Sequence, residues 1–365
     1  MSGYFAVHYY RRVTKPRITW MDSARGLAIL LVVFYHVVSA LVDNGISVPH
    51  ELVYFNRALA PLRIPALIFL SGLLLPRALG KSGLEYFSGK ARFVLYPYLV
   101  WTALTAANDA RILHDPEWAH RIGKSLLTAP FHTWFLAVLL GLYVVAWFVR
   151  SVSRTVLVAV SVAANLVVPE ASPMILQEFA FLAGFFFLGC ACAEHADSFE
   201  RFLASRAAKA VALVGFVALA VFAVGGVGQL FSYDVKMIGW CAAAIIGTVL
   251  SVRFLDQRLG ALLSPLRYVG RNSLRYYVMH FPLLPIFTML LIHDGGMTHG
   301  TRLIALMGLG ILVMITAVSL LADRIKVFEL LFAVPELWRH DRTAGSKSAP
   351  SESSAELERA PTAPR

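Results

Sequence analysis

One stretch decides the fold, residues 17–41, which reads RITWMDSARGLAILLVVFYHVVSAL. About 20 residues of α-helix span the ~30 Å hydrocarbon core of a bilayer, so this stretch is long enough to cross a membrane. It nevertheless carries Asp22, Arg25 and His36. Ionisable groups at membrane depth cost about 2.5–3.5 kcal/mol each on insertion scales, so a helix serving only as an anchor is not expected to contain three of them.

The spacing of these three residues places them along one face of the helix. His36 follows Arg25 by 11 positions, which at ~100° per residue is three turns plus about 20°. Asp22 precedes Arg25 by one turn and is within reach of an ion pair with it. We expect this polar line to face the protein interior or a water-filled cavity. The alternative is a structural Asp–Arg pair near the headgroups, with a tolerated histidine above it.

Composition places the whole chain in one class. Of its 365 residues, 58% are hydrophobic and 15% are charged, whereas soluble domains contain about 25% charged residues. We therefore predict an all-α polytopic membrane protein. The net charge of +11 would suggest nucleic acid as a partner of a soluble protein. Here the basic residues lie between apolar runs, where they set orientation in the membrane, and no nucleic-acid partner is expected.

The cysteines predict neither a metal site nor a disulfide. Cys190, Cys192 and Cys241 all lie within apolar runs, and we interpret them as small buried apolar residues. The chain also lacks a phosphate-binding loop, a dinucleotide fingerprint and the common zinc-protease and serine-hydrolase motifs. No permanently bound cofactor is therefore expected.

The loops between apolar runs predict the topology. Lys and Arg gather in alternate loops, such as 77–92, 201–209 and 253–271, although loop 111–131 departs from this pattern. Because positive loops favour the cytoplasmic side, we predict about ten crossings with both termini in the cytoplasm. The predicted spans are residues 18–41, 61–79, 92–110, 133–149, 154–168, 174–193, 207–226, 237–252, 273–292 and 302–322.

Two polar ends flank the predicted membrane domain. Residues 1–16 are basic and form a cytoplasmic N-terminal segment, and residues 17–325 form the transmembrane domain. Residues 326–365 form a cytoplasmic tail. From about residue 341 the tail is rich in Ser, Ala and Pro, a composition typical of disorder.

The polar line on the first helix carries residue types suited to group transfer. Histidine accepts or donates a proton near neutral pH, which makes His36 a candidate catalytic residue. The planar guanidinium of Arg25 is suited to clamping a phosphate or carboxylate. We assign Asp22 the role of holding Arg25 in place. Together they suit transfer of a group from a phosphorylated carrier.

Three further candidates lie at the outer ends of predicted spans. Arg63 opens the run RIPALIFLSG, and His132 and Trp134 lie in the motif FHTWFL. They could line a substrate mouth, with the Trp134 ring stacked on a sugar. The alternatives are a snorkelling arginine and an ordinary interfacial tryptophan. Ser71 and Gly72, which close the first run, favour close packing between helices.

The motif YVGRNSLRYYVMH supplies the last candidates. Ser273, Tyr277 and His280 are spaced to lie on one helical face, where they could line a substrate pathway. The alternative for Ser273 is a helix cap shared with Asn272. Glu178 enters the sixth predicted span from the outside, and we interpret it as an interfacial residue.

Together these motifs resemble the acyltransferase 3 family of integral membrane proteins. The segment DSARGLAILLVVFYH contains the family's arrangement of Arg, ten residues and His, as Arg25 and His36. The segments RIPALIFLSG, HTWFL and GRNSLRYYVMH resemble its other elements and occur in the family's order. The likeness covers residues 17–325 and extends to the predicted number of helices.

The resemblance implies a reaction. Such a protein would move an acyl group, commonly acetyl, from a cytoplasmic acyl-CoA to a hydroxyl of a carbohydrate, glycan or glycolipid. His36 would be the base or the acyl-relaying residue, and Arg25 would hold the anionic part of the donor. The protein would lie in the inner or plasma membrane of the cell, in contact with its lipids. It would act without the soluble C-terminal domain that some relatives carry.

Two other functions compete with this one. Intramembrane His, Arg and Asp also mark proton or solute pathways in transporters and exporters, although the sequence shows no matched halves with interrupted helices. A structural or regulatory membrane protein is the third interpretation, and the polar line on the first helix argues against it. The acceptor, the acyl chain and the oligomeric state stay open at this point.

Overall fold

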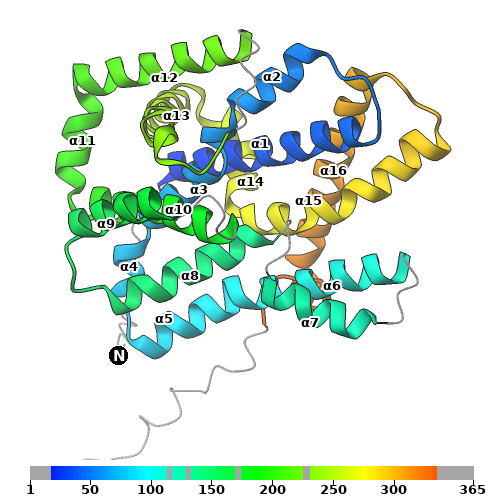
Figure 1. Ribbon diagram of the computed structural model, residues 1–365, viewed down its shortest axis with the longest axis horizontal. Helices are drawn as coiled ribbons and strands as arrows, with labels where there is room; N and C mark the ends of the chain where they lie inside the picture. Colours follow the sequence, from blue (N-terminus) through cyan, green and yellow to red (C-terminus); the bar gives the residue numbers. More distant parts are fainter. Residues whose placement is uncertain (1–17, 113–116, 129–132, 169–173, 225–230, 335–365) are drawn as a thin grey trace, which may run out of the picture.

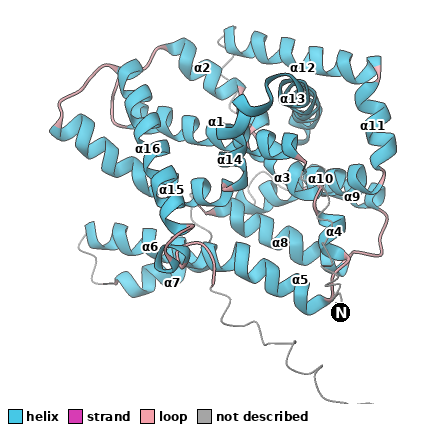
Figure 2. Ribbon diagram, turned by 180° about the vertical axis from the view of Figure 1, so that it is seen from behind, coloured by secondary structure: helices cyan, strands magenta, loops and turns pink. Residues whose placement is uncertain are grey.

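The protein is helical throughout the part of the chain that the structure, a computed structural model, describes: residues 18–112, 117–128, 133–168, 174–224 and 231–334. No strand occurs within those ranges (Figure 2). The helices are α1 (Thr19–Asp43), α2 (His50–Ala58), α3 (Ile64–Gly72), α4 (Leu75–Leu79), α5 (Gly83–Lys90), α6 (Tyr96–Ile112), α7 (Trp118–Thr128), α8 (Trp134–Phe148), α9 (Arg154–Val167), α10 (Met174–Glu194), α11 (Ala196–Ala204), α12 (Arg206–Val224), α13 (Ile238–Leu259), α14 (Ser264–Arg271), α15 (Ser273–Thr288), α16 (Gly300–Ala322) and α17 (Lys326–Glu329). Short 3₁₀ turns cover Ala60–Leu62, Val235–Met237 and Gly260–Leu263, and π-helical turns cover Ala91–Leu95 and Met289–Asp294.

The prediction of an all-α polytopic membrane protein is confirmed, but the number of spans is not. By length and composition, 5 helical segments among the described residues could cross a membrane, or 7 if two bent pairs each count as one span. The bends are 46° between α2 and the segment ending with α3, and 68° between α11 and α12. Helices α8 and α9 are apolar but shorter. Ten crossings and cytoplasmic termini stay predictions.

The expected continuous span at residues 61–79 is wrong, because prolines divide it. Pro61, Pro65 and Pro76 each stand at the first or second position of a new short helical segment. Proline lacks a backbone N–H and is favoured at such starts, where that group would have no partner within the helix. Residues 61–79 are therefore divided among three helical segments, where apolar composition alone predicts one continuous helix.

Helix α1 occupies the centre of the molecule. It packs against α13, α14, α15 and α16, with α3 also in contact, and Figure 1 shows it crossing the middle of the assembly. In the N-terminal part of α1, the hydroxyls of Thr19 and Ser23 donate to the Asp256 carboxylate of α13, which also pairs with Arg267 of α14. The N-terminal turn of α1 is thus tied to two other helices.

Glycines bring α1 and α14 into direct backbone contact. A Cβ added to Gly26 would overlap the carbonyl oxygen of Leu266, and one added to Gly270 would overlap that of Asp22. Small residues allow such close approach in membrane proteins, where packing rather than water exclusion holds helices together. The crossing therefore depends on both glycines.

The crossing of α3 and α10 has the same design. A Cβ on Gly72 would overlap the carbonyl oxygen of Phe186, and a Cβ on Gly189 would overlap that of Phe69. The prediction that Ser71-Gly72 serves close helix packing is confirmed. The Ser71 hydroxyl donates to the Leu67 carbonyl within its own helix, at 2.8 Å.

The beginning of the predicted tail is packed. The hydroxyl of Tyr96 and the indole N–H of Trp101, both in α6, donate to the carbonyls of Leu330 and Leu331 at 2.7 and 2.8 Å. Phe332 is buried and stacks on Trp101. Residues up to 334 therefore belong to the helical body, and residues 335–365 lie outside the described part.

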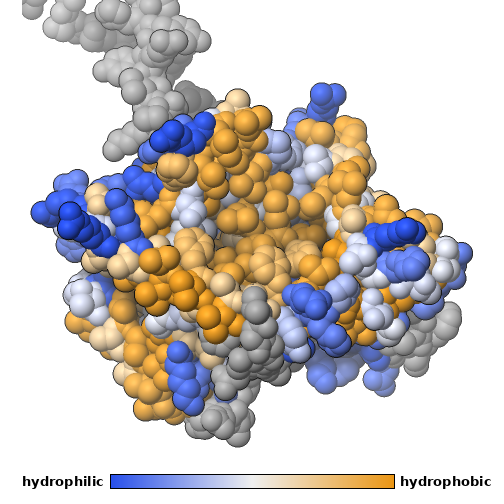
Figure 3. All heavy atoms as spheres, turned by 90° about the horizontal axis from the view of Figure 1, so that it is seen from above, coloured by the Kyte–Doolittle hydropathy of each residue, from blue (hydrophilic) through white to orange (hydrophobic). Residues whose placement is uncertain are grey.

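The surface agrees with a membrane environment. Apolar side chains cover the middle of the face seen in Figure 3, around a central hollow, and hydrophilic side chains gather toward its margins. Many large hydrophobic residues of α12 and α16 are exposed, among them Leu213, Val214, Leu309 and Val313. Such continuous apolar exposure is typical of contact with lipid rather than with water.

The glycine contacts between α3 and α10 make a first prediction. Gly72→Ala or Gly189→Ala should lower the free energy of unfolding by about 1–3 kcal/mol, because the new methyl meets a backbone carbonyl that cannot rotate away. Thermal unfolding in detergent micelles would measure the loss. Gly308→Ala in α16 is the matched control, since nothing lies within 4 Å of a Cβ there. Equal stability of all three variants would contradict the prediction.

Candidate active site

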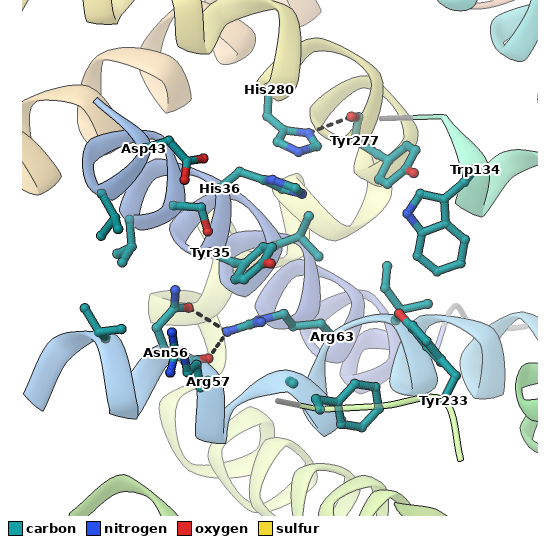
Figure 4. Close-up of a pocket in the computed structure, with 18 of the residues that line it drawn as sticks. Tyr35, His36, Asp43, Asn56, Arg57, Arg63, Trp134, Tyr233, Tyr277 and His280 are labelled. Atoms are coloured by element: carbon teal, nitrogen blue, oxygen red, sulfur yellow. Dashed lines mark hydrogen bonds between the residues drawn. The ribbon is translucent and has the colours of Figure 1, made fainter. Parts of the chain in front are cut away.

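A cavity of about 380 Å³ lies beside the C-terminal half of α1. Its lining comes from α1, α2, α8, α10 and α15, the turn around Arg63, and residues 231 and 233. We call it the His36 cavity. In Figure 4, His36 and His280 lie on one side of it, Arg63 and Asn56 on another, and Trp134 and Tyr233 beyond them.

His36 and His280 meet across the interface between α1 and α15. Their ring centroids are 5.0 Å apart, and Phe281 stands edge-on to His36 at 5.5 Å. Nδ1 of His280 donates to the carbonyl of Tyr277 at 2.6 Å (Figure 4). Because a carbonyl oxygen only accepts hydrogen bonds, this contact keeps a proton on Nδ1. Proton exchange at His280 therefore takes place at Nε2.

Arg63 is held rigidly at the start of α3. Its Nη2 donates to the backbone carbonyl of Asn56 and, at 2.6 Å, to the Asn56 side-chain oxygen (Figure 4). Its guanidinium lies 4.6 Å from the centroid of the Tyr35 ring, a favourable cation–π distance. Arg63 is only 6% exposed, so the snorkelling interpretation is wrong. A fixed positive charge faces the cavity instead.

An aromatic wall closes another side of the cavity. Trp134 begins α8 and meets the Tyr233 ring edge-on, with centroids 5.7 Å apart. Phe181 packs on Tyr233 at 5.6 Å, and the Asn165 side-chain amide donates to the Tyr233 carbonyl at 3.0 Å. Glu178 of α10 lines the same cavity and is 2% exposed.

Arg25 lies elsewhere, beside a second basic residue. Its Nη2 donates to the Leu70 carbonyl of α3 at 3.1 Å. Nζ of Lys90, at the end of α5, is 3.4 Å from the centroid of the Tyr143 ring. Burial, followed by the positive charges of Lys81 and Arg25, lowers the pKa of Lys90 to about 8. We call Arg25, Lys90 and Tyr143 the Arg25 cluster.

The structure brings together five of the nine residues singled out from the sequence, and these line the His36 cavity: His36, Arg63, Trp134, Tyr277 and His280. Arg25 and Asp22 lie in the first half of α1, outside that lining. Ser273 begins α15 and is also outside it, and Asn272 makes no side-chain cap there. His132 lies outside the described residues. The roles of all nine stay predictions.

Sequence reasoning did not assign several residues to these two sites, and it interpreted Glu178 as an interfacial residue rather than part of a cavity lining. Glu178 had a usable signal, since it is the one acidic residue in the apolar run 174–193. Lys90 immediately precedes the third predicted span, and its position beside Arg25 depends on how α5 packs. Asn56 and Tyr233 lie in segments with no distinctive pattern.

The fold is that of a multi-pass membrane protein, and comparison with known proteins identifies its family. Residues 18–323 match a family model described as an acyltransferase domain. The chain belongs to the acyltransferase 3 family.

One curated relative and the solved structures complete the comparison. The chain is 37% identical over 71 residues to the inner membrane protein YcfT of Escherichia coli (strain K12). That match covers 17% of this chain and 20% of the relative, so it spans about a fifth of that protein's length. No solved structure matches.

The anchoring of Arg63 makes a second prediction. Asn56→Ala should lower the free energy of unfolding by about 1.5–3 kcal/mol, because it removes a buried hydrogen bond to a charged group. Chemical denaturation followed by tryptophan fluorescence would measure it. Asn44→Ala is the control, because the Asn44 side chain bonds to a backbone carbonyl at an exposed helix end. Equal losses in the two variants would show that Asn56 does not anchor Arg63.

Proposed function

We propose that the protein transfers an acyl group, commonly acetyl, from a cytoplasmic acyl-CoA to a hydroxyl of a carbohydrate, glycan or glycolipid. The observation that carries the proposal is the arrangement along α1. His36 faces His280 in a cavity. Arg25, on the same helix 11 residues before His36, lies near Lys90 of α5. That separation corresponds to about 16 Å of helix. A helix of this kind can hold the two ends of one extended donor molecule.

The Arg25 cluster would receive the anionic end of the donor. The guanidinium of Arg25 and the ammonium of Lys90 are suited to phosphate oxygens. Arg92 and the exposed Arg271 lie on flanking segments and would add positive charge at the cytoplasmic mouth. The arm that carries the acyl group would then extend along α1 toward His36.

His36 would act on the acceptor hydroxyl. As the hydroxyl oxygen attacks the thioester carbonyl, His36 takes the hydroxyl proton. The new C–O bond forms, the C–S bond breaks, and the departing thiolate takes up the proton. Alternatively His36 accepts the acyl group first and passes it to the hydroxyl, with the same products. His280, fixed through Nδ1, can share the transferred proton at Nε2 in either route.

Family membership favours this reaction over solute export, the competing interpretation of the same polar residues. The relative YcfT is an inner membrane protein, which supports the inner or plasma membrane of the cell as the location. A donor from the cytoplasm would then reach the Arg25 cluster directly.

Replacement of His36 tests the proposed chemistry. His36→Ala in purified, folded protein should lower acyl transfer from acetyl-CoA by about 10²–10⁴-fold, because general-base assistance is worth that much. Release of free CoA thiol, measured spectrophotometrically with membrane-extracted glycan as acceptor, would report the rate. His293→Ala, at an exposed position, controls for loss of a histidine. Full activity in His36→Ala would exclude the proposed role.

The pKa of Lys90 leads to a pH prediction for donor binding. Below pH 8 the ammonium is charged and can pair with phosphate. As the pH rises through about 8 the charge is lost. The KM for acetyl-CoA should therefore be constant below pH 8 and rise toward tenfold per pH unit above it.

Lys90→Arg should flatten that profile, because arginine stays charged throughout the range. Lys81→Arg is the matched control, since it leaves Lys90 titrating beside a positive charge. Initial rates between pH 6.5 and 9.5, corrected for spontaneous thioester hydrolysis, would give the three profiles. Superimposable profiles for the wild type and Lys90→Arg would show that Lys90 does not bind the donor.

A further inference from the structure

Glu178 is a buried carboxyl whose placement is unfavourable in free energy, and the proposed chemistry does not use it. It is 2% exposed, lies within the membrane-spanning helix α10, and lines the His36 cavity. Its Oε2 has no hydrogen-bond partner, and the carboxyl forms no ion pair with any described residue. Burial of a carboxyl without partners costs free energy. A leucine would pack here without that cost, so retention of the carboxyl points to a ligand.

Arg63, in the same cavity, has a hydrogen-bond donor without a partner. Its Nη2 is occupied by Asn56, but its Nε is buried without a hydrogen-bond partner. Arg63 and Glu178 form no ion pair with each other, although both line the cavity. Nε of Arg63 is thus an unsatisfied donor and Oε2 of Glu178 an unsatisfied acceptor, and the two do not satisfy each other.

The unsatisfied acceptor on Glu178 and the unsatisfied donor on Arg63 indicate the chemistry of the ligand. An ammonium group only donates hydrogen bonds, and a phosphate or carboxylate ion only accepts them, whereas a hydroxyl does both. A neutral ring with neighbouring hydroxyls can donate to Glu178 and accept from Arg63. Its apolar face can lie on Trp134, which stands beside Tyr233 in the same lining.

We propose that Glu178 and Arg63 are the acceptor-binding residues, each engaging a hydroxyl of a neutral polyhydroxylated ring that lies against Trp134. This inference rests on the proposed function, because it makes that ring the acyl acceptor. The bound ring would present a further hydroxyl to His36. Glu178 thus selects the acceptor and takes no part in the transfer of the acyl group.

Glu178→Leu separates a ligand-binding role from a structural one. If the carboxyl serves only the ligand, its replacement by a well-packing apolar residue should leave the midpoint of thermal unfolding unchanged or raise it. A clear fall in the midpoint would show that Glu178 holds the structure together, and would overturn the proposal. Glu178→Gln keeps the shape and replaces the carboxyl group with an amide. Glu194→Gln in the same helix, at an ion pair with Arg154, is the matched control.

Binding is measured directly with methyl glucoside, by saturation-transfer NMR on the full-length protein in lipid nanodiscs. We expect wild type and Glu194→Gln to bind it, Glu178→Gln to bind about tenfold more weakly, and Glu178→Leu to show no binding. The permethylated glucoside has no hydroxyl to donate, so it should not bind specifically to the wild type or to any of the three variants. Methyl glucosaminide tests the competing ligand chemistry, an ammonium group.

Three results would overturn the proposal. They are no methyl glucoside binding by wild type, equal binding by wild type and Glu178→Leu, and binding of the ammonium sugar alone. Turnover of acetyl-CoA by the wild type is scored separately. Sugar binding without turnover would contradict the proposed acyl transfer but leave the sugar site standing. Turnover that does not depend on Glu178 would support acyl transfer and contradict the role of Glu178 in binding the acceptor.

Discussion

The polar side chains of α1 must be kept away from lipid, and the rest of the structure depends on that requirement. Asp22 and Ser23 are buried, and Arg25 and His36 are partly so. Each would be costly against hydrocarbon. Helices α3, α13, α14, α15 and α16 surround α1 and supply partners in its place, such as the Leu70 carbonyl for Arg25. A helix that would be a poor anchor alone thereby becomes the axis of the fold.

Such shielding requires backbones to approach closely, which explains the paired glycines. Gly26 and Gly270 each lie on the carbonyl of the opposing helix where α1 crosses α14. Helix α15 follows α14 after a single residue, so this crossing also sets where α15 begins relative to α1. His280 is therefore brought to His36 by a packing contact near the other end of α1. The small size of Gly26 and Gly270 allows the close crossing of α1 and α14, and that crossing helps to place His280 beside His36.

Features with a local signature could be predicted from the sequence, and features made by long-range packing could not. The helical class, the polar face of α1, the packing role of Ser71-Gly72 and the candidates His36 and His280 all follow from composition or spacing within one segment. The breaks at Pro61, Pro65 and Pro76 had a signal too, but apolar composition outweighed it. The positions of Lys90 and Asn56 depend on how distant helices fold together, and no spacing rule reports that.

The two candidate residues on α1 lie in different surroundings. Arg25 and His36 lie on one face of a single helix, yet they contact different neighbours, α3 and α15. A face of a long helix is not one environment, because several elements cover it in succession. In the proposed reaction, that division would let one helix serve both ends of the donor. The imidazole pair lies among the aromatic rings of Phe281, Tyr277 and Phe135. In the proposed reaction, these surroundings would favour transfer to a bound hydroxyl over transfer to water, while the basic cluster would receive the charged donor.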